Sequence, residues 1–169
     1  MNILYKALLI ISLIILSSCS STKYEKASAF KYYGYEDTQI LDSTYEIKYK
    51  VNYKTSLRKC VDFALIRASK IALENNKDFL LKKLEAYRSY EKNPKTLSGT
   101  FVASSAVGEK YAVDRVGNAI IEIGLSNKGI NSCALCAIIS EKYGTDFFKK
   151  DFCNCTTNKD ELVKIEMLL

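Results

Sequence analysis

The chain contains no histidine and no tryptophan, and only one proline, Pro94, in 169 residues. Without histidine, the sequence excludes Ser-His-Asp and Cys-His catalytic arrangements, imidazole general bases and histidine-containing zinc sites. Its seven glycines form no phosphate-binding spacing, and its carboxylates show no pairing pattern. The sequence therefore predicts no catalytic residue and no cofactor, and a non-enzymatic function is preferred to an enzymatic one.

The composition is typical of one globular domain, with 48% apolar and 26% charged residues. The chain carries 25 basic and 19 acidic side chains, which gives a formal net charge of +6. The basic residues are interleaved with acidic ones, which argues against nucleic-acid binding. The tyrosine-rich segments are expected to form strand core and rim and not a binding platform; they contain Tyr32, Tyr33, Tyr35, Tyr45, Tyr49 and Tyr53.

The amino terminus has the layout of a secretory signal, with a cation at Lys6, an apolar run over Ala7–Leu16 and small residues before Cys19. The run is too short to span a bilayer, which needs about 20 apolar residues. In addition, Leu16-Ser17-Ser18-Cys19 resembles the bacterial lipobox, Leu-(Ser/Ala)-(Gly/Ala/Ser)-Cys. This resemblance implies cleavage before Cys19, a diacylglyceryl thioether on its sulfur and acylation of the new amino terminus.

The lipobox resemblance also implies a location. Two or more acyl chains hold a protein firmly to a membrane, so the lipid on Cys19 would be the membrane anchor. In Gram-negative lipoproteins an aspartate after the lipidated cysteine favours retention in the inner membrane, and this chain has Ser20 there. We therefore expect residues 1–18 to be a signal peptide, 19–33 a lipidated tether, and 34–169 a single periplasmic domain attached to the outer membrane.

Periodicity and capping signals predict an α+β domain. Strict alternation over 45–51 predicts a strand, and Thr55 or Ser56 can cap a helix that ends near Asn75. Residues 78–90 favour a helix by propensity, but a strand is preferred because they follow a helix and a turn. The other expected elements are strands at 100–103 and 119–125, a helix from Asn131 or Ser132 to Gly144, and extended pieces at 146–155 and 161–168. This order predicts a mainly antiparallel sheet with two helices packed on one face.

The stretch from Gly34 to Phe79 contains a series of spaced motifs, namely Gly34-Tyr35, Leu41, Tyr45-Glu46-Ile47-Lys48-Tyr49, Asn52-Tyr53-Lys54-Thr55, Phe63-Ala64-Leu65-Ile66-Arg67-Ala68-Ser69 and Phe79. In these residues the stretch resembles a family of small Gram-negative envelope lipoproteins. The resemblance implies an envelope location and a strand around Phe79, but it implies no chemistry, because the family has no established activity.

Four cysteines near the carboxy terminus are candidates for disulfide bonds. Cys133 and Cys136 lie one helical turn apart, and Cys153 and Cys155 share one face of an extended segment. Because an oxidising envelope favours disulfides, we expect two bridges among these four that staple the carboxy-terminal half, with the pairing left open. Cys60 would then remain a buried free thiol.

Two alternatives exist for the same cysteines. Four thiolates could hold a structural zinc ion, although the close spacing of Cys153 and Cys155 weakens this reading. Alternatively, Cys133 and Cys136 form a Cys-x-x-Cys motif at a helix amino terminus, as in thioredoxin-like thiol–disulfide oxidoreductases. Those enzymes have a cis-proline later in the chain than the dithiol, whereas Pro94 precedes it here.

Taken together, these features predict a membrane-anchored envelope lipoprotein that acts as a structural or interaction module. Its partners would be the membrane, through the lipid on Cys19, and an envelope protein or a cell-wall polymer. The alternative function is a periplasmic oxidoreductase that uses Cys133 and Cys136.

Overall fold

The computed structural model describes residues 21–28, 31–92, 101–104, 110–144, 147–148 and 152–153. In this part of the chain, two strands precede the first helix and three strands separate it from the second. These elements are β1 (Gly34–Leu41), β2 (Thr44–Asn52), α2 (Leu57–Glu74), β3 (Asp78–Lys92), β4 (Phe101–Ser104), β5 (Lys110–Ser126) and α3 (Ser132–Tyr143).

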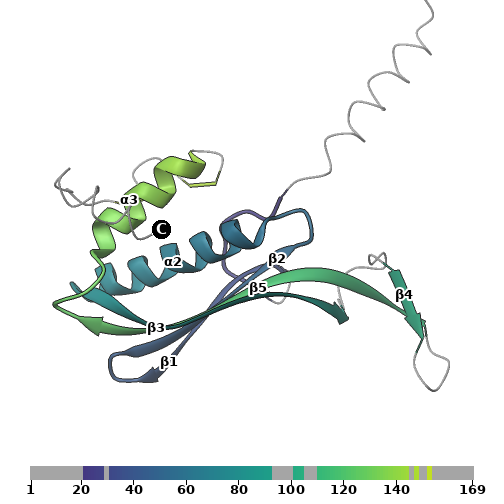
Figure 1. The fold of residues 1–169 in the computed structure, drawn as a ribbon, viewed down its shortest axis with the longest axis horizontal. Helices are drawn as coiled ribbons and strands as arrows, with labels where there is room; N and C mark the ends of the chain where they lie inside the picture. The colour runs from purple at the N-terminus through teal and green to yellow at the C-terminus, as the bar shows by residue number, and fades with distance from the viewer. Residues whose placement is uncertain are drawn as a thin grey trace, which may run out of the picture.

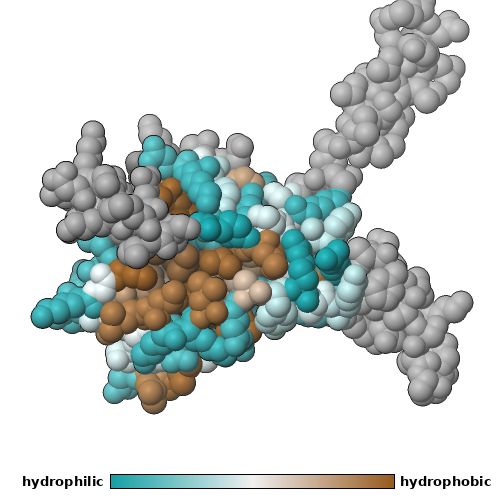
Figure 2. Space-filling view, in the orientation of Figure 1, coloured by the Kyte–Doolittle hydropathy of each residue, from teal (hydrophilic) through white to brown (hydrophobic). Residues whose placement is uncertain are grey.

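The strands form one antiparallel sheet in the order β1-β2-β5-β3, and the short β4 pairs with β5 as well. Both helices lie on the same side of this sheet, α2 against the sheet itself and α3 against α2 (Figure 1). The predicted α+β class, with an antiparallel sheet and two helices on one face, is therefore confirmed. Figure 2 shows that hydrophobic residues gather on the surface of the molecule where α2 meets the sheet.

The alternating pattern in β2 places its apolar side chains toward α2. Ile47, Tyr49 and Val51 are buried, and Ile47 and Tyr49 lie opposite Ile121 and Ala119 of β5, which are buried too. Because successive side chains of a strand point to opposite faces, the residues between them face away from the helices. We call the side of the sheet that points away from α2 the outer face.

Both helices begin and end where the capping signals predict. The Ser56 side chain accepts a hydrogen bond from the backbone N–H of Lys59 at 3.1 Å, and α2 ends at Asn75. The Asn131 side chain accepts a hydrogen bond from the backbone N–H of Ala134 at 2.8 Å, and Gly144, with φ +67°, closes α3. These bonds satisfy amide groups that the first helical turn leaves without a partner.

Residues 78–90 form a strand, as predicted against their helical propensity. β3 pairs with β5 along its whole length, and Phe79 at its start is fully buried. In the described part of the sheet β3 is an edge strand, with Leu80, Leu84 and Tyr87 among its exposed side chains. Tertiary pairing therefore overrides local propensity here.

Three features differ from the expected elements. β1 is a strand that no sequence signal predicts, and β5 begins at Lys110, nine residues before the expected strand. Of the extended piece expected over 146–155, residues 147–148 and 152–153 form a turn and bends and not a strand. The rest of that piece, and the piece at 161–168, lie outside the described residues.

Residues 21–28, which the sequence assigns to the tether, lie against the domain. Thr22 is buried, and its backbone N–H donates to the Thr55 hydroxyl at 2.8 Å. The Tyr24 ring contacts the rings of Tyr35, Tyr49, Phe63, Phe148 and Phe152, with centroids 5.1 to 6.1 Å away. This aromatic cluster fixes the segment to the helical side of the sheet.

The Tyr24 hydroxyl is buried and has no hydrogen-bond partner within the described structure. Replacing Tyr24 with phenylalanine removes this unsatisfied group and keeps the ring contacts, so we expect the free energy of unfolding to rise by about 1 kcal/mol. Urea denaturation followed by circular dichroism measures the change. Tyr24→Ala is the matched control and should destabilise the protein; a loss of stability in both variants would contradict this account.

Candidate functional site

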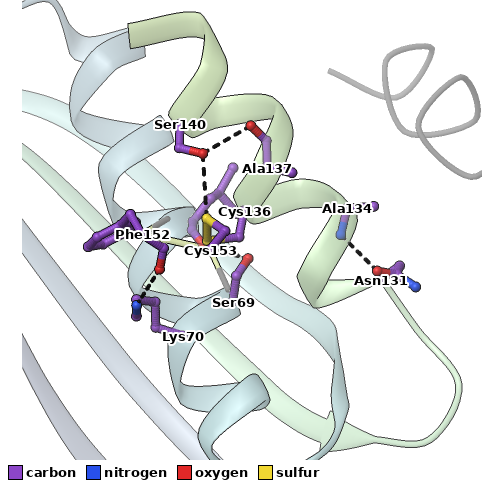
Figure 3. Close-up of a disulfide and its surroundings, with 10 residues drawn as sticks. Ser69, Lys70, Asn131, Ala134, Cys136, Ala137, Ser140, Phe152 and Cys153 are labelled. Atoms are coloured by element: carbon purple, nitrogen blue, oxygen red, sulfur yellow. Dashed lines mark hydrogen bonds between the residues drawn. A yellow bond between two sulfur atoms is a disulfide. The ribbon is translucent and has the colours of Figure 1, made fainter. Parts of the chain in front are cut away.

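The structure joins Cys136, on the first turns of α3, to Cys153 by a disulfide bond (Figure 3). Cys133 is disulfide-bonded as well, whereas Cys19 and Cys155 lie outside the described residues. The prediction that disulfides stabilise the carboxy-terminal half is thus confirmed for the Cys136–Cys153 bridge. Next to it, the Lys70 ammonium donates to the backbone carbonyl of Phe152 at 2.8 Å.

This bridge bears on both alternatives for the cysteines. The zinc reading needs Cys136 and Cys153 as separate thiolates, but their sulfurs are bonded to each other. No group of three or more metal-ligating side chains occurs among the residues that the structure describes. The oxidoreductase reading needs Cys133 and Cys136 to pair with each other, and Cys136 has a different partner; this reading stays a prediction.

Cys60 is a buried free thiol, as predicted. It lies on α2 facing the sheet, and its S–H donates to the backbone carbonyl of Tyr49 at 3.3 Å. Burial raises the pKa of the Cys60 thiol to about 12. Since the thiolate is the reactive form, this cysteine is inert at neutral pH.

The register of the sheet brings polar side chains together on the outer face. One row across the four strands consists of Gly34, Lys50, Asn118 and Tyr87. The next row consists of Glu36, Lys48, Ile120 and Glu85. Side chains at these positions share one face because directly opposite residues in antiparallel strands point the same way.

A cavity of about 420 Å³ lies over these two rows. The segment that precedes β1 forms one wall of the cavity, with Ala27, Ser28, Lys31 and Tyr32. Its floor contains Lys50 and Asn118 from the first row and Ile120 from the second, with Tyr87 and Glu91 contributed by β3. We call this feature the outer-face cavity.

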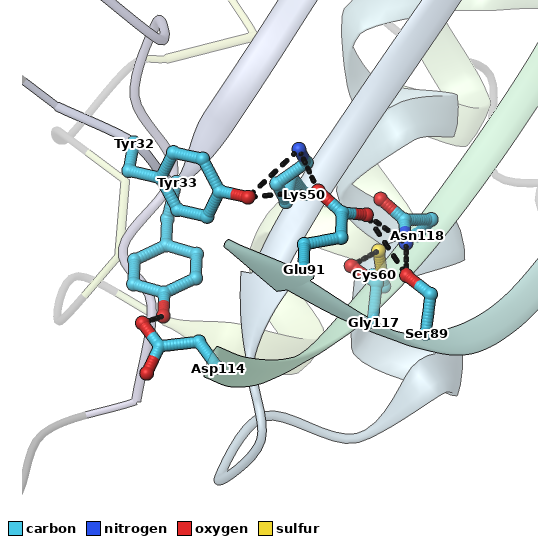
Figure 4. A network of polar contacts seen from close by, with 9 residues as sticks. All are labelled: Tyr32, Tyr33, Lys50, Cys60, Ser89, Glu91, Asp114, Gly117 and Asn118. Carbon is cyan, nitrogen blue, oxygen red and sulfur yellow. Dashed lines mark hydrogen bonds and ion pairs between the residues drawn. The ribbon is translucent and has the colours of Figure 1, made fainter. Parts of the chain in front are cut away.

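Glu91 is the centre of a hydrogen-bond network in the outer-face cavity (Figure 4). One of its carboxylate oxygens accepts from the Lys50 ammonium at 2.5 Å and from the Tyr32 hydroxyl at 2.7 Å. The other accepts from the Ser89 hydroxyl at 2.8 Å and from the Asn118 amide at 3.2 Å. The network therefore joins β2, β3 and β5 to the segment before β1.

The network keeps Glu91 ionised. Partial burial acts to raise the pKa of its carboxyl group, but the hydrogen bonds from Lys50, Tyr32 and Ser89 outweigh this effect and lower the pKa to about 2. Conversely, burial and the hydrogen bond to Glu91 raise the pKa of the Tyr32 hydroxyl. At neutral pH, Tyr32 is therefore a donor and Glu91 an acceptor.

The lysines that line the cavity are paired with carboxylates. Lys50 pairs with Glu91, Lys48 pairs with Glu46 at 2.8 Å, and Lys31 pairs with Glu25. The Lys50 ammonium also lies 4.5 Å from the centre of the Tyr32 ring, which adds a cation–π contact. The cavity therefore has a polar lining whose cations are already neutralised.

Sequence reasoning missed this site. It assigned the tyrosines between residues 32 and 53 to strand core and rim, which holds for Tyr49 but not for Tyr32, whose hydroxyl donates to Glu91. The contributing residues come from four separate segments and form no motif. Only the register of β2, β5 and β3 brings Lys50, Asn118 and Tyr87 side by side.

No protein-family model, curated protein or solved structure matches this chain. Within the described residues, neither helix has the length and hydrophobicity needed to cross a membrane. The resemblance to envelope lipoproteins thus rests on the motif residues between Gly34 and Phe79 and on the lipobox.

Proposed function

We propose that this protein is an outer-membrane lipoprotein, anchored by lipid on Cys19, whose periplasmic domain is a non-enzymatic binding module of the cell envelope. The lipobox at residues 16–19 supports the anchor. The Cys136–Cys153 bridge supports an oxidising compartment, where disulfides persist. The outer-face cavity carries the binding role, because it is the feature in which aromatic and polar side chains converge on one space.

The packing of the amino-terminal segment bears on how such an anchor would work. Thr22 is hydrogen-bonded to Thr55 and Asn52, so the chain is attached to the domain three residues after Cys19. At about 3.5 Å per residue, the domain would then lie within roughly 10 Å of the lipidated sulfur. The lipid would therefore hold the domain close to the membrane surface. The linker between lipid and domain would be shorter than the tether over 19–33 that the sequence predicts.

Replacing Cys19 with alanine tests the anchor. Without the sulfur that carries the diacylglyceryl group, we expect the protein to leave the membrane fraction when it is expressed in a Gram-negative envelope. Ser17→Ala is the matched control, because alanine is compatible with the lipobox at that position, and this variant should stay in the membrane fraction. Density-gradient separation assigns the wild-type protein to the outer or inner membrane.

Two results would contradict the proposal. Unchanged membrane fractionation of the Cys19→Ala protein would mean that the lipobox is not used. Recovery of the wild-type protein with the inner membrane would refute the outer-membrane location.

A further inference from the structure

We propose that the outer-face cavity binds a neutral, polyhydroxylated ligand, namely a segment of an oligosaccharide chain. This inference rests on the proposed binding role and specifies its ligand class. The volume of about 420 Å³ falls within the range of about 300–1,000 Å³ that is typical of small-molecule sites. The residues that line the cavity then determine which class of ligand it can bind.

The charges in the cavity disfavour an ionic ligand. Lys31, Lys48 and Lys50 are each paired with a carboxylate. An anion would have to compete with these carboxylates. A cation would be repelled by the three lysines, which outnumber the two carboxylates that line the cavity, Glu36 and Glu91. A neutral ligand can enter with the ion pairs intact, which avoids leaving a partly buried charge without its partner.

The polar groups equally disfavour a purely apolar ligand. Lys50, Asn118 and Glu91 line the cavity with donors and acceptors that lie close together, and Ser89 bonds to both Asn118 and Glu91. Covering them with hydrocarbon would desolvate these groups without replacing their contacts with water. Sugar hydroxyl groups both donate and accept, so they can replace that water.

Two tyrosines supply the flat surfaces that a sugar ring needs. Tyr87 comes from the edge strand β3, lies directly opposite Asn118 and is 45% exposed. Tyr32 comes from the wall formed by the segment before β1, and its hydroxyl donates to Glu91. A tyrosine ring offers an apolar face and a polar tip, which match the C–H faces and the hydroxyl rim of a sugar. Ile120 adds an apolar side chain to the floor, in the row next to that of Tyr87.

The test uses the full mature lipoprotein, purified in a detergent that has no sugar headgroup. Isothermal titration calorimetry and saturation-transfer NMR measure binding of two probes, fully N-acetylated chitotetraose and maltotetraose. Both are neutral oligosaccharides, but only the first carries acetamido groups. We expect millimolar or tighter binding of at least one probe, and the preferred probe separates acetamido-bearing glycans from plain hexose chains.

Single substitutions test whether the probes bind in the outer-face cavity. Tyr87→Ala removes the more exposed ring and should weaken binding about tenfold, and Glu91→Gln should weaken it as well by loosening Lys50 and Tyr32. Tyr53→Ala is the matched control, because Tyr53 is 51% exposed but does not line the cavity, and it should bind like the wild type. Thermal unfolding of each variant verifies that it is folded.

Two results would overturn the inference. The first is no binding of either probe at millimolar concentration, and the second is binding that Tyr87→Ala and Tyr53→Ala weaken equally. The fractionation of the Cys19→Ala protein is independent of these titrations. A negative titration therefore rejects the oligosaccharide ligand without deciding the lipid anchor.

Discussion

Replacing Asp62 with alanine is expected to lower the free energy of unfolding by about 3 kcal/mol. The Asp62 side chain lies on α2 and is only 2% exposed. Its carboxylate accepts from the Tyr143 hydroxyl at 2.6 Å and from the Lys142 ammonium at 2.7 Å, and Arg58 lies 3.3 Å away. Alanine removes all three interactions and leaves a small cavity.

The effect is large because Asp62 fastens the last turn of α3 to α2. Lys142 and Arg58 are about half exposed, so water can solvate them when the carboxylate is gone. Tyr143 is more buried, and its hydroxyl loses a partner that water replaces only in part. Burial and the hydrogen bond to Asp62 raise the pKa of Tyr143, so its hydroxyl remains a donor at neutral pH.

Urea denaturation at neutral pH measures this loss. Glu74→Ala is the matched control on the same helix, because the Glu74 side chain is 57% exposed and its ion pair with Arg67 should contribute about 0.5 kcal/mol or less. A double-mutant cycle of Asp62→Ala with Tyr143→Phe isolates the hydrogen bond between them. Equal destabilisation by Asp62→Ala and Glu74→Ala would contradict the role given to the buried carboxylate.

The sequence predicts those elements whose side chains face the core. β2 and α2 were located because burial of one face imposes a period on them, and both helix caps follow from local side-chain chemistry. β1 was missed because residues 38–41, its second half, are exposed on both faces, so they have no alternation to detect. The early part of β5 was missed for a different reason, because the polar residues Asp114, Arg115 and Asn118 interrupt its apolar pattern although Asp114 and Asn118 are buried.

The candidate site could not be predicted from the sequence for a different reason. Tyr24 and Tyr32 lie only eight residues apart, yet Tyr24 enters the aromatic cluster on the helical side and Tyr32 reaches Glu91 on the outer face. The chain changes sides between them, where the backbone of Ala27 donates to the carbonyl of Tyr35 at 2.9 Å. No local pattern encodes such a crossing, because its energy comes from contacts with distant strands.

Removing the Cys136–Cys153 bridge, by replacing both cysteines with alanine, is expected to lower the free energy of unfolding by about 3 kcal/mol. The bridge closes a loop with a sequence separation of 17, so the unfolded chain gains conformational freedom when the bridge is lost. It also holds the segment that contributes Phe148 and Phe152 to the aromatic cluster around Tyr24. Loosening that segment should therefore also expose Tyr24.

Denaturant unfolding, with tyrosine fluorescence as the probe, measures both effects. The wild-type protein under reducing conditions is the matched comparison and should lose at least as much stability, because reduction also opens the disulfide of Cys133. A double variant as stable as the oxidised wild type would contradict the structural role of the bridge.

The same samples decide the oxidoreductase alternative. Cys60, the free cysteine among the described residues, is buried, and burial raises its pKa to about 12, so it should resist alkylation at neutral pH. A redox-active pair of Cys133 and Cys136 would instead cycle through an accessible, low-pKa thiol during turnover with glutathione. If glutathione at physiological concentration leaves the native protein unreactive toward alkylating agents, the bridge is a structural staple and the oxidoreductase hypothesis fails. Rapid alkylation of Cys133 after glutathione is added would instead support the oxidoreductase hypothesis.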